Sequence, residues 1–261
     1  MCKEVKAVTG RVILVGGGPG ADDLITVRGL DRLMAADVVI TDRLAPVGLL
    51  TRLGPDVEII DAAHLPGQPT MTYEQIISVM IDRALAGLTV VRLKGGDPFV
   101  FAHGAQEVEA CVAAGIPVEV VPGVTSATAA PALAGIPLTN SDGAAGFTVV
   151  SGHLHPEDPT CRIDWSALAR CGTNLVILMG MRQLPAIVDR LITDGVAADA
   201  PATCVADASL SEQRVVRTAL SDLPTAVKAA ALINPATVII ETSGYASSPR
   251  ALALEVPAQQ R

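Results

Sequence analysis

The chain has 261 residues, of which 50% are hydrophobic, and a formal net charge of −8. A chain of this length forms one large or two modest domains around a substantial core. The acidic balance argues against nonspecific binding to nucleic acid or to an acidic membrane surface, and charges or glycines interrupt every apolar run before it reaches the length of a membrane span.

Cysteines are odd in number and show no paired spacing: Cys2, Cys111, Cys161, Cys171 and Cys204. Such a set is typical of reduced thiols rather than of a disulfide framework. The N-terminal residues also lack the charged region and apolar stretch of an export signal. We therefore predict a cytoplasmic protein.

The first predicted element is an apolar strand at residues 12–15, which ends in a glycine-rich turn at residues 16–20. Asp22 or Asp23 is placed to cap the helix that follows. Apolar residues recur at helical spacing along this helix and predict one buried face: Leu24, Val27, Leu30, Leu33 and Met34.

The opening turn admits a second interpretation. Gly16, Gly18 and Ala21 satisfy the dinucleotide-binding pattern, which makes an NAD-dependent oxidoreductase one hypothesis. Pro19 argues against it, because proline removes a backbone donor from the loop that would hold a pyrophosphate.

Four more strands are predicted in this half, at residues 38–41, 57–60, 89–93 and 118–121. Helical patterns alternate with them, which is typical of a mostly parallel sheet covered by helices. The clearest helix follows Thr72, which forms a capping box with Gln75, and Gly87 ends it. Its predicted buried stripe is Ile76, Ile77, Met80, Ile81, Ala84 and Leu85.

Glycine-rich turns also follow the last two of these strands, at residues 94–98 and 122–126. In an open α/β sheet, ligands bind where such carboxyl-end loops meet. Glycines let a ligand approach the backbone, and Asp97 offers a carboxylate for a hydroxyl or a cation. Each turn is a candidate small-molecule site. Phe99, Phe101 and Phe147 are expected to pack in the core.

After Pro122 the strands have fewer helices between them, and several fit antiparallel pairing: residues 147–151, 175–179, 203–205, 214–218 and 237–241. We therefore predict an α/β fold of two lobes. Residues 1–122 form an N-terminal lobe around a mostly parallel five-stranded sheet, residues 123–250 form a C-terminal lobe with a mixed sheet, and residues 251–261 form a loose tail.

Five segments resemble the tetrapyrrole (corrin/porphyrin) methyltransferase family: VILVGGGPG (12–20), ADVVITDRL (36–44), VRLKGGDPFVF (91–101), VPGVTS (121–126) and GIPLT (135–139). Residues 93–101 are the most specific and are similar to the members that methylate uroporphyrinogen III. The resemblance implies methyl transfer from S-adenosylmethionine to ring carbons of uroporphyrinogen III, giving precorrin-2 on the way to sirohaem and cobalamin. It also implies a homodimer and an active site in the cleft between the two lobes.

By position, the resemblance assigns the S-adenosylmethionine site to nine residues: Pro19, Gly95, Gly96, Asp97, Val100, Thr125, Ser126, Met179 and Thr203. Backbone groups, one carboxylate and apolar walls suit the adenine, the ribose diol and the amino acid end of this cofactor. Without the resemblance, Gly95 and Gly96 would merely serve a tight turn, and Met179 would be ordinary core.

Asp42 matches the family's proposed proton acceptor, and His64 stands where the family has a lysine proposed as the proton donor. Toward the substrate, His103 and Asn140 replace an arginine and a histidine of the family's pattern. These changes remove cationic side chains that would face substrate carboxylates, and Glu241 replaces a late glycine near the cofactor.

These departures leave two alternatives open: a family enzyme with a different methyl acceptor, and a noncatalytic ligand-binding protein that retains the cofactor loops. His153 and His155 are two residues apart, but no further ligand at metal-binding spacing completes a set. We predict a small-molecule tetrapyrrole partner and no metal, nucleic acid or membrane partner.

Overall fold

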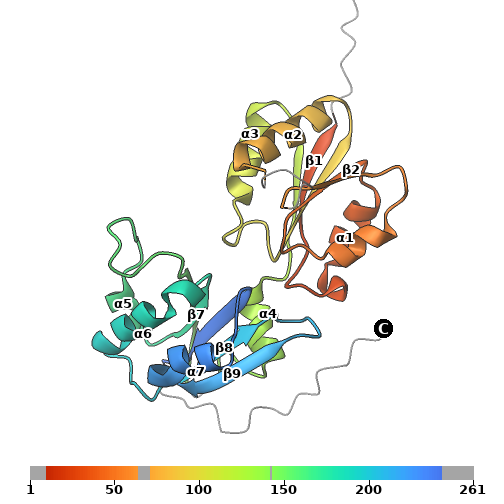
Figure 1. Ribbon diagram of the computed structural model, residues 1–261. Helices are drawn as coiled ribbons and strands as arrows, with labels where there is room; N and C mark the ends of the chain where they lie inside the picture. Colours follow the sequence, from red (N-terminus) through yellow and green to blue (C-terminus); the bar gives the residue numbers. More distant parts are fainter. Residues whose placement is uncertain (1–9, 64–70, 142, 243–261) are drawn as a thin grey trace, which may run out of the picture. The chain divides into compact units, whose positions relative to one another are not determined.

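The computed structural model describes residues 10–63, 71–141 and 143–242 (Figure 1). The chain divides into two compact units, one that ends at Thr125 and one that begins at Ser126. The boundary expected after residue 122 lies three residues earlier than this division. The predicted tail at 251–261 lies outside the described residues.

The first unit is built on a five-stranded sheet in the order β3-β2-β4-β1-β5, in which every pair is parallel. Its strands are β1 (Arg11–Gly16), β2 (Val38–Thr41), β3 (Glu58–Asp61), β4 (Thr89–Lys94) and β5 (Val118–Val121). The predicted parallel sheet is confirmed. All of residues 12–15 are fully buried, because a central strand of a parallel sheet is covered on both faces and is therefore continuously apolar.

Helices cover both faces of this sheet: η1 (Asp22–Leu24), α1 (Val27–Met34), η2 (Val47–Arg52), α2 (Tyr73–Leu85) and α3 (Gly104–Ala113). Residues of α2 and α3 pack into the core on one face, and residues of α1 and η2 pack into the core on the other. The predicted capping box of α2 is present, because Thr72 and Gln75 each accept the backbone N–H of the other. Leu85, predicted in the buried stripe, is exposed.

The start of α1 differs from the prediction. Thr26 caps this helix by accepting the Gly29 N–H at 3.1 Å, whereas Asp22 and Asp23 lie in the separate 3₁₀ turn η1. Because two extended residues, Ile25 and Thr26, separate η1 from α1, the helix begins later than predicted. The apolar residues predicted to form one helical face therefore do not all lie on one side of it. Val27 is accordingly exposed.

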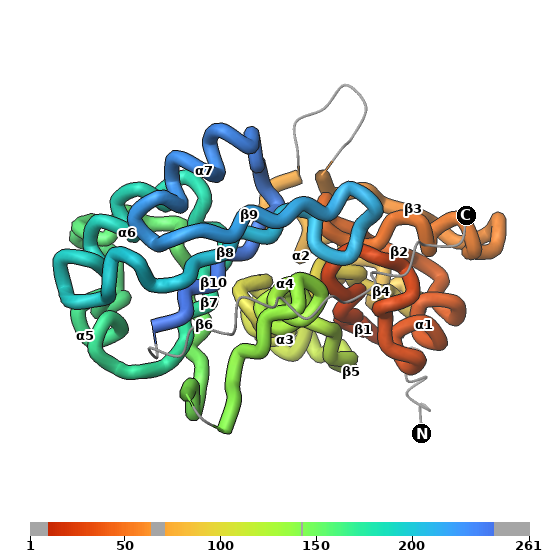
Figure 2. Tube along the Cα trace, turned by 90° about the horizontal axis from the view of Figure 1, so that it is seen from below, coloured from red at the N-terminus to blue at the C-terminus, as the bar shows by residue number. Residues whose placement is uncertain are grey.

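The second unit contains a mixed sheet in the order β6-β7-β10-β8-β9. Its strands are β6 (Phe147–Ser151), β7 (Asn174–Leu178), β8 (Pro201–Ala206), β9 (Arg214–Ala219) and β10 (Ala236–Ile240). β6 and β7 are parallel, whereas β7, β10, β8 and β9 pair antiparallel, so the predicted mixed sheet is confirmed. Figure 2 follows the chain through the β8–β9 hairpin.

The helices of the second unit are α4 (Ser126–Leu133), α5 (Trp165–Arg170), η3 (Met181–Gln183), α6 (Leu184–Thr193), η4 (Leu220–Asp222) and α7 (Leu223–Ala229). The larger core lies between the sheet and α5, α6 and α7. A smaller core around Ala130 and Ile239 joins α4 to the opposite face. Among the described helices, none has the length and apolar character needed to span a bilayer.

Candidate active-site residues and their setting

The three glycine-rich turns of the first unit meet at the carboxyl ends of β1, β4 and β5. A Cβ atom on Gly16 would lie 2.5 Å from Gly123 Cα, and a Cβ on Gly123 would lie 2.1 Å from the Gly96 carbonyl oxygen. Both distances are too short for any side chain. The glycines at 16 and 123 are therefore required for the close approach of three backbone segments.

The backbone of the opening turn pairs with the turn at residues 94–98, whereas the dinucleotide hypothesis requires it to bind a pyrophosphate. Gly18 and Gly96 exchange two backbone hydrogen bonds, at 3.2 and 2.7 Å. A pyrophosphate-binding turn leads directly into the N-terminus of a helix, whereas here α1 begins only at Val27. The glycine pattern is explained by backbone pairing with the second turn.

Asp97 joins the second and third turns. Its Oδ1 accepts the Phe99 N–H at 2.8 Å, and its Oδ2 accepts the Gly123 N–H at 3.0 Å. A carboxylate has about four acceptor positions, so Asp97 retains capacity for a ligand hydroxyl while it holds the two loops together. Beside it, Gly96 has φ +66°, and a Cβ there would meet only Thr125 Cα, at 3.9 Å. The backbone at Gly96 thus borders open space.

The segment after Asp97 exposes apolar side chains and contains strained backbone. Phe99 and Phe101 in this segment are exposed, and so is Phe147 at the start of β6. The expectation that these three side chains pack in the core is therefore wrong. Phe101 and His103 have φ of 52° and 59°, a region that non-glycine residues rarely adopt. Such strain is typical of ligand-contacting segments. Val100 lies in this loop, where its N–H donates to the Asp97 carbonyl.

Asp42 follows the last residue of β2, at the carboxyl edge of the same sheet. Its Oδ1 accepts the Leu44 N–H at 3.1 Å, and its Oδ2 lies 3.6 Å from Arg92 Nη2. The side chain is 33% exposed, so the carboxylate is both anchored and accessible. His64, the second predicted proton-transfer residue, lies outside the described residues.

His103 is exposed directly before α3 and contacts Tyr73. The Tyr73 hydroxyl donates to the His103 carbonyl oxygen at 3.1 Å, and the two ring centroids are 5.4 Å apart. Burial, reinforced by the negative charge of Glu107, raises the pKa of the Tyr73 hydroxyl to about 12. Tyr73 therefore remains a neutral hydrogen-bond donor over the range in which enzymes work.

We expect Tyr73 to ionise near pH 12 in the folded protein, against an ordinary value of 10.0. The folded state then binds a proton that the unfolded state releases between these values, so stability falls as the pH rises above 10. Ultraviolet difference absorbance of tyrosinate measures this step. Only one other tyrosine exists in the chain, so Tyr73→Phe should remove the ionisation step near pH 12. Ionisation of both tyrosines near pH 10 would contradict the expectation.

Four predicted site residues lie in the second unit or at its start. Ser126 begins α4 directly after Thr125. Met179 follows β7 with φ 57° and is 47% exposed, so it is not an ordinary core residue. Thr203 is buried in β8, where its hydroxyl accepts from Arg217 Nε at 3.3 Å. The Asn140 side-chain oxygen is buried without a hydrogen-bond partner among the described residues.

Glu241, which replaces the family's glycine, is also buried in the second unit. Its Oε1 lies 4.0 Å from Arg217 Nη2 and has no hydrogen-bond partner among the described residues. Its backbone N–H donates to the Pro201 carbonyl oxygen at 2.9 Å. The carboxylate therefore occupies space beside β8 that a glycine would leave free.

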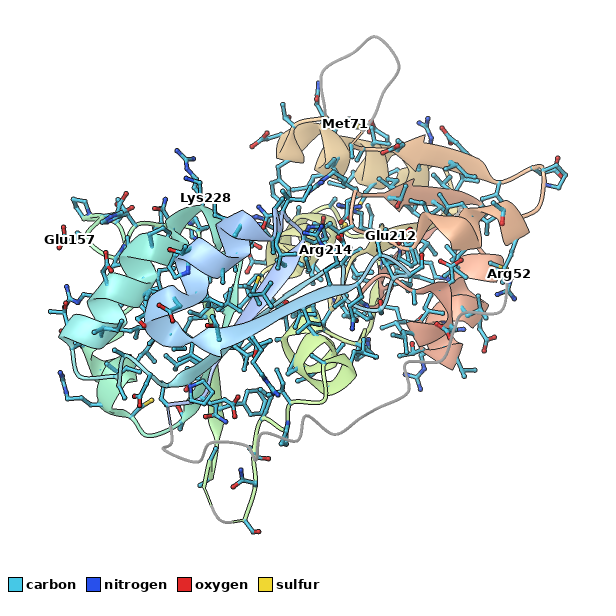
Figure 3. All side chains as sticks on the ribbon, turned by 60° about the horizontal axis from the view of Figure 1, so that its bottom comes forward. Arg52, Met71, Glu157, Glu212, Arg214 and Lys228 are labelled. Carbon is cyan, nitrogen blue, oxygen red and sulfur yellow. The ribbon has the colours of Figure 1, made fainter. Side chains whose placement is uncertain are left out.

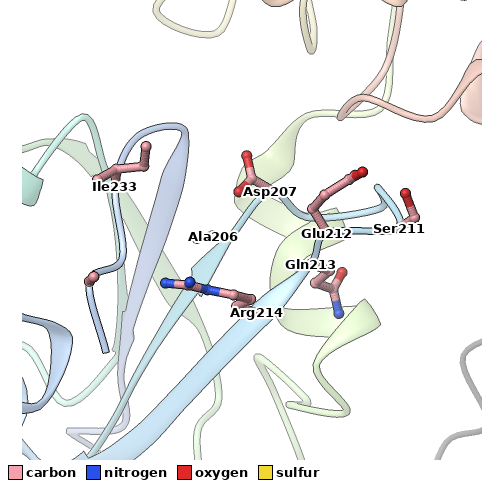
Figure 4. A pocket seen from close by; sticks show the side chains of 8 residues that line it. Ala206, Asp207, Ser211, Glu212, Gln213, Arg214 and Ile233 are labelled. Atoms are coloured by element: carbon pink, nitrogen blue, oxygen red, sulfur yellow. The ribbon is translucent and has the colours of Figure 1, made fainter. Parts of the chain in front are cut away.

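A hollow of about 540 Å³ opens beside the β8–β9 hairpin of the second unit (Figure 4). It is lined by Ala206, Asp207, Ser211, Glu212, Gln213, Arg214, Ala231 and Ile233. Glu212 and Arg214 come from the end of the hairpin loop and the start of β9 (Figure 3). None of the predicted site residues lines this hollow. Within the described part of the chain, no group of three or more histidines, cysteines or acids is arranged to hold a metal ion.

Sequence reasoning missed a set of buried charges near Asp42. Arg92 and Lys94 in β4 and Glu107 in α3 are almost completely buried. One signal was available: Arg92 interrupts an apolar strand that is central to a parallel sheet, where an unpaired charge is very costly. The identity of its partner, fifteen residues further on, was not evident from the pattern.

Comparisons with known proteins agree with this architecture. The model of the tetrapyrrole (corrin/porphyrin) methylases matches residues 11–224. A uroporphyrinogen-III C-methyltransferase of Priestia megaterium is 40% identical over 231 residues, which cover 88% of this chain and 97% of the relative. A siroheme synthase of Gluconacetobacter diazotrophicus is 42% identical over 88% of this chain and 49% of the relative. The chain thus spans about half the length of the siroheme synthases it matches.

Solved structures give the same result. The uroporphyrin-III C-methyltransferase of Thermus thermophilus in complex with S-adenosylhomocysteine has a TM-score of 0.72 and 35% identity, over 88% of this chain and 97% of that one. A cobalt precorrin-4 methyltransferase has a TM-score of 0.79 and 28% identity, over 88% and 94% of the two chains. The chain belongs to the tetrapyrrole (corrin/porphyrin) methylase family. The NAD-dependent oxidoreductase hypothesis is therefore wrong.

Proposed function

We propose that this chain is an S-adenosylmethionine-dependent C-methyltransferase that acts on uroporphyrinogen III and gives precorrin-2, in sirohaem and cobalamin biosynthesis. The observation that carries this proposal is the 40% identity to a named uroporphyrinogen-III C-methyltransferase over 97% of that relative. The carboxyl-end loops of the parallel sheet supply a second argument, because ligands of such sheets bind there.

The residues present fit the cofactor. Gly96 borders open space, the Asp97 carboxylate has acceptor capacity for a ribose hydroxyl, and Met179 offers an exposed apolar surface held in a strained conformation. We propose that the binding residues are Pro19, Gly95, Gly96, Asp97, Val100, Thr125, Ser126, Met179 and Thr203. Thr203 differs from the other proposed binding residues, because its hydroxyl is buried and already accepts a hydrogen bond from Arg217.

S-adenosylmethionine, when bound, supplies a methyl group that is already activated by the sulfonium. The chain's own work is to hold the acceptor carbon in line and to exclude water. A proton must then leave the methylated ring, and Asp42 is the proposed acceptor because its anchored carboxylate remains partly exposed. His64 stays a predicted proton donor.

His103 and Asn140 are the proposed substrate-binding residues. His103 is exposed and is itself one of the two strained residues of the loop, with Phe101. The buried Asn140 oxygen has unused acceptor capacity among the described residues. Their replacement of cationic side chains favours one rival, a family enzyme with a different tetrapyrrole acceptor. Fewer fixed cations would suit an acceptor with fewer carboxylates.

A product assay tests the proposal directly. Purified protein is incubated anaerobically with S-adenosylmethionine and enzymatically generated uroporphyrinogen III, and the product is followed by mass and absorbance. We expect two added methyl groups. Binding of S-adenosylhomocysteine without any methylation would favour a different acceptor or the noncatalytic alternative, and these are separated by assaying other tetrapyrroles. Absence of S-adenosylhomocysteine binding would overturn the proposal.

We further infer that the protein is a cytoplasmic homodimer, with no nucleic acid partner. The cytoplasmic inference is supported by four cysteines that are free in the described residues: Cys111, Cys161, Cys171 and Cys204. Light scattering coupled to size-exclusion chromatography measures the oligomeric state, and a monomer mass would contradict the dimer.

Asp97→Ala is expected to weaken S-adenosylhomocysteine binding by about tenfold or more, because hydrogen bonds to charged groups contribute about 1.5–3 kcal/mol each. It should also lower the melting temperature, since the Phe99 and Gly123 N–H groups lose their acceptor. Calorimetry and thermal unfolding measure the two effects. Asp158→Ala is the matched control: Asp158 also accepts a backbone N–H, from Thr160, and should leave affinity unchanged. Wild-type affinity in Asp97→Ala would remove Asp97 from the site.

A further inference from the structure

Three charged side chains are buried on the face of the first sheet that α2 and α3 cover. The side chains of Arg92 and Lys94 in β4 are 5% and 3% exposed, and that of Glu107 in α3 is 1% exposed. The Glu107 carboxylate accepts from Arg92 Nε at 3.1 Å and from Lys94 Nζ at 2.8 Å. These three residues, the buried charge cluster, carry two positive charges and one negative charge.

Each nitrogen of the Arg92 guanidinium has a partner. Nε donates to Glu107, and Nη1 lies 3.3 Å from the carbonyl oxygens of both Ile40 and Leu93. Nη2 faces Asp42 Oδ2 at 3.6 Å. Residues of β2, β4 and α3 therefore fix the plane of the guanidinium, and Asp42 supplies the negative charge that balances the cluster.

Packing alone gives no reason for this arrangement. Ions lose their hydration when they are buried, and well-packed apolar replacements of a buried ion pair are often neutral or stabilising. Burial indeed lowers the pKa of the Lys94 ammonium, and the nearby Arg92 charge acts in the same direction. A costly cluster with one guanidinium edge directed at an accessible carboxylate is better explained by what it does to that carboxylate.

Both oxygens of Asp42 are held by separate partners. Oδ2 faces Arg92, while Oδ1 accepts the Leu44 N–H. The Leu44 carbonyl oxygen in turn approaches Gly95 so closely that a Cβ at Gly95 would lie 2.6 Å from it. The orientation of Asp42 and the position of the Gly95 loop are thus set by one continuous series of contacts.

We propose that Arg92 is a positioning residue for Asp42. The buried charge cluster fixes the guanidinium, and the guanidinium fixes the carboxylate that takes the proton from the methylated ring. This inference rests on the proposed function of Asp42. Misplacement of a reacting group by about 1 Å costs up to about a hundredfold in rate, so the effect of losing Arg92 should appear in turnover more than in cofactor binding.

A double-mutant cycle tests the proposal in the full-length protein. The variants are Arg92→Lys, Asp42→Asn and the double variant, and the readouts are the single-turnover methylation rate and the S-adenosylhomocysteine affinity. Arg92→Lys keeps the charge but loses the planar fork, and we expect its rate to fall by about 10- to 100-fold with little change in affinity. In the Asp42→Asn background the same change should alter the rate by less than about twofold.

Arg32→Lys provides the matched control. Arg32 also belongs to the first unit and donates through Nε to a carboxylate, that of Glu119, at 2.9 Å. This pair joins α1 to β5, and neither of its members is a proposed site residue. Its loss should leave both the rate and the affinity as in the wild type.

Amide exchange of Leu44 supplies a readout that does not depend on activity. Because the Leu44 N–H is donated to Asp42, Arg92→Lys should speed its exchange by about tenfold or more, and Arg32→Lys should not. If Arg92→Lys fails to fold, Asp42→Glu moves the carboxylate by one methylene and leaves the cluster intact. It should then lower the rate by about tenfold or more at unchanged affinity.

Equal rate losses for Arg92→Lys in both backgrounds would overturn the proposal, because Arg92 would then act independently of Asp42. A wild-type rate in Asp42→Glu would do the same. An unchanged rate in Asp42→Asn would reject the role of Asp42, and with it the positioning by Arg92. If the wild type forms no methylated product, the proposed function fails, and the Leu44 exchange comparison still decides whether Arg92 orients Asp42.

Discussion

Asp42→Asn is expected to lower the single-turnover rate of methylation by about a hundredfold or more. Asparagine has the same shape, and its side-chain oxygen still accepts the Leu44 N–H that anchors the turn. An amide, however, does not take up a proton at neutral pH, so the step assigned to Asp42 is lost. Rapid-quench kinetics measures the rate, and calorimetry with S-adenosylhomocysteine shows whether the cofactor site is intact.

Asp164→Asn is the control for this experiment. Asp164 also accepts a backbone N–H through Oδ1, at the start of α5, and asparagine caps a helix about as well as aspartate. Its rate and affinity should match those of the wild type. If Asp42→Asn instead lowers affinity while the rate per bound cofactor is unchanged, Asp42 has a structural role only.

Gly123→Ala is expected to destabilise the protein by about 3 kcal/mol and to weaken S-adenosylhomocysteine binding. The added Cβ would lie 2.1 Å from the Gly96 carbonyl oxygen and 2.6 Å from Gly16 Cα. Both are backbone atoms, which move only if the glycine turns separate. That separation would also break the hydrogen bond from the Gly123 N–H to Asp97.

Urea denaturation followed by circular dichroism measures this effect, with Gly54→Ala as the control. A Cβ at Gly54 meets nothing within 4 Å, so alanine there restricts the unfolded chain without a clash and should stabilise by about 0.4–1 kcal/mol. Wild-type stability and affinity in Gly123→Ala would show that the three turns do not pack as closely as described.

Much of the fold follows from local signals. The strands at 12–15 and 38–41 are buried runs, and their burial on the two faces of a parallel sheet explains why they are continuous rather than alternating. The capping box at Thr72 and Gln75 depends on residues three apart, so its geometry is contained in the sequence. Family motifs also located the glycine-rich turns.

Other features depended on which of several local options the chain adopts. Asp22, Asp23 and Thr26 are all good capping residues, and only the packing of η1 and α1 decides that Thr26 caps the helix. Phe99 and Phe101 have core-like side chains, yet the strained turn after β4 leaves them exposed. Hydrophobicity alone does not distinguish these outcomes.

The sequence by itself determined the succession of strands and helices along the chain, the two-sheet α/β class and the positions of the glycine-rich turns. Each of these depends on residues close together in the chain. Only the tertiary structure decided that Asp97 holds Gly123, that Gly18 pairs with Gly96, and that Arg92 joins Glu107 to Asp42. These contacts join residues that are distant in sequence. Buried charges and close backbone approaches have no periodic signature, since they are favourable only when a specific partner is brought into place by the fold.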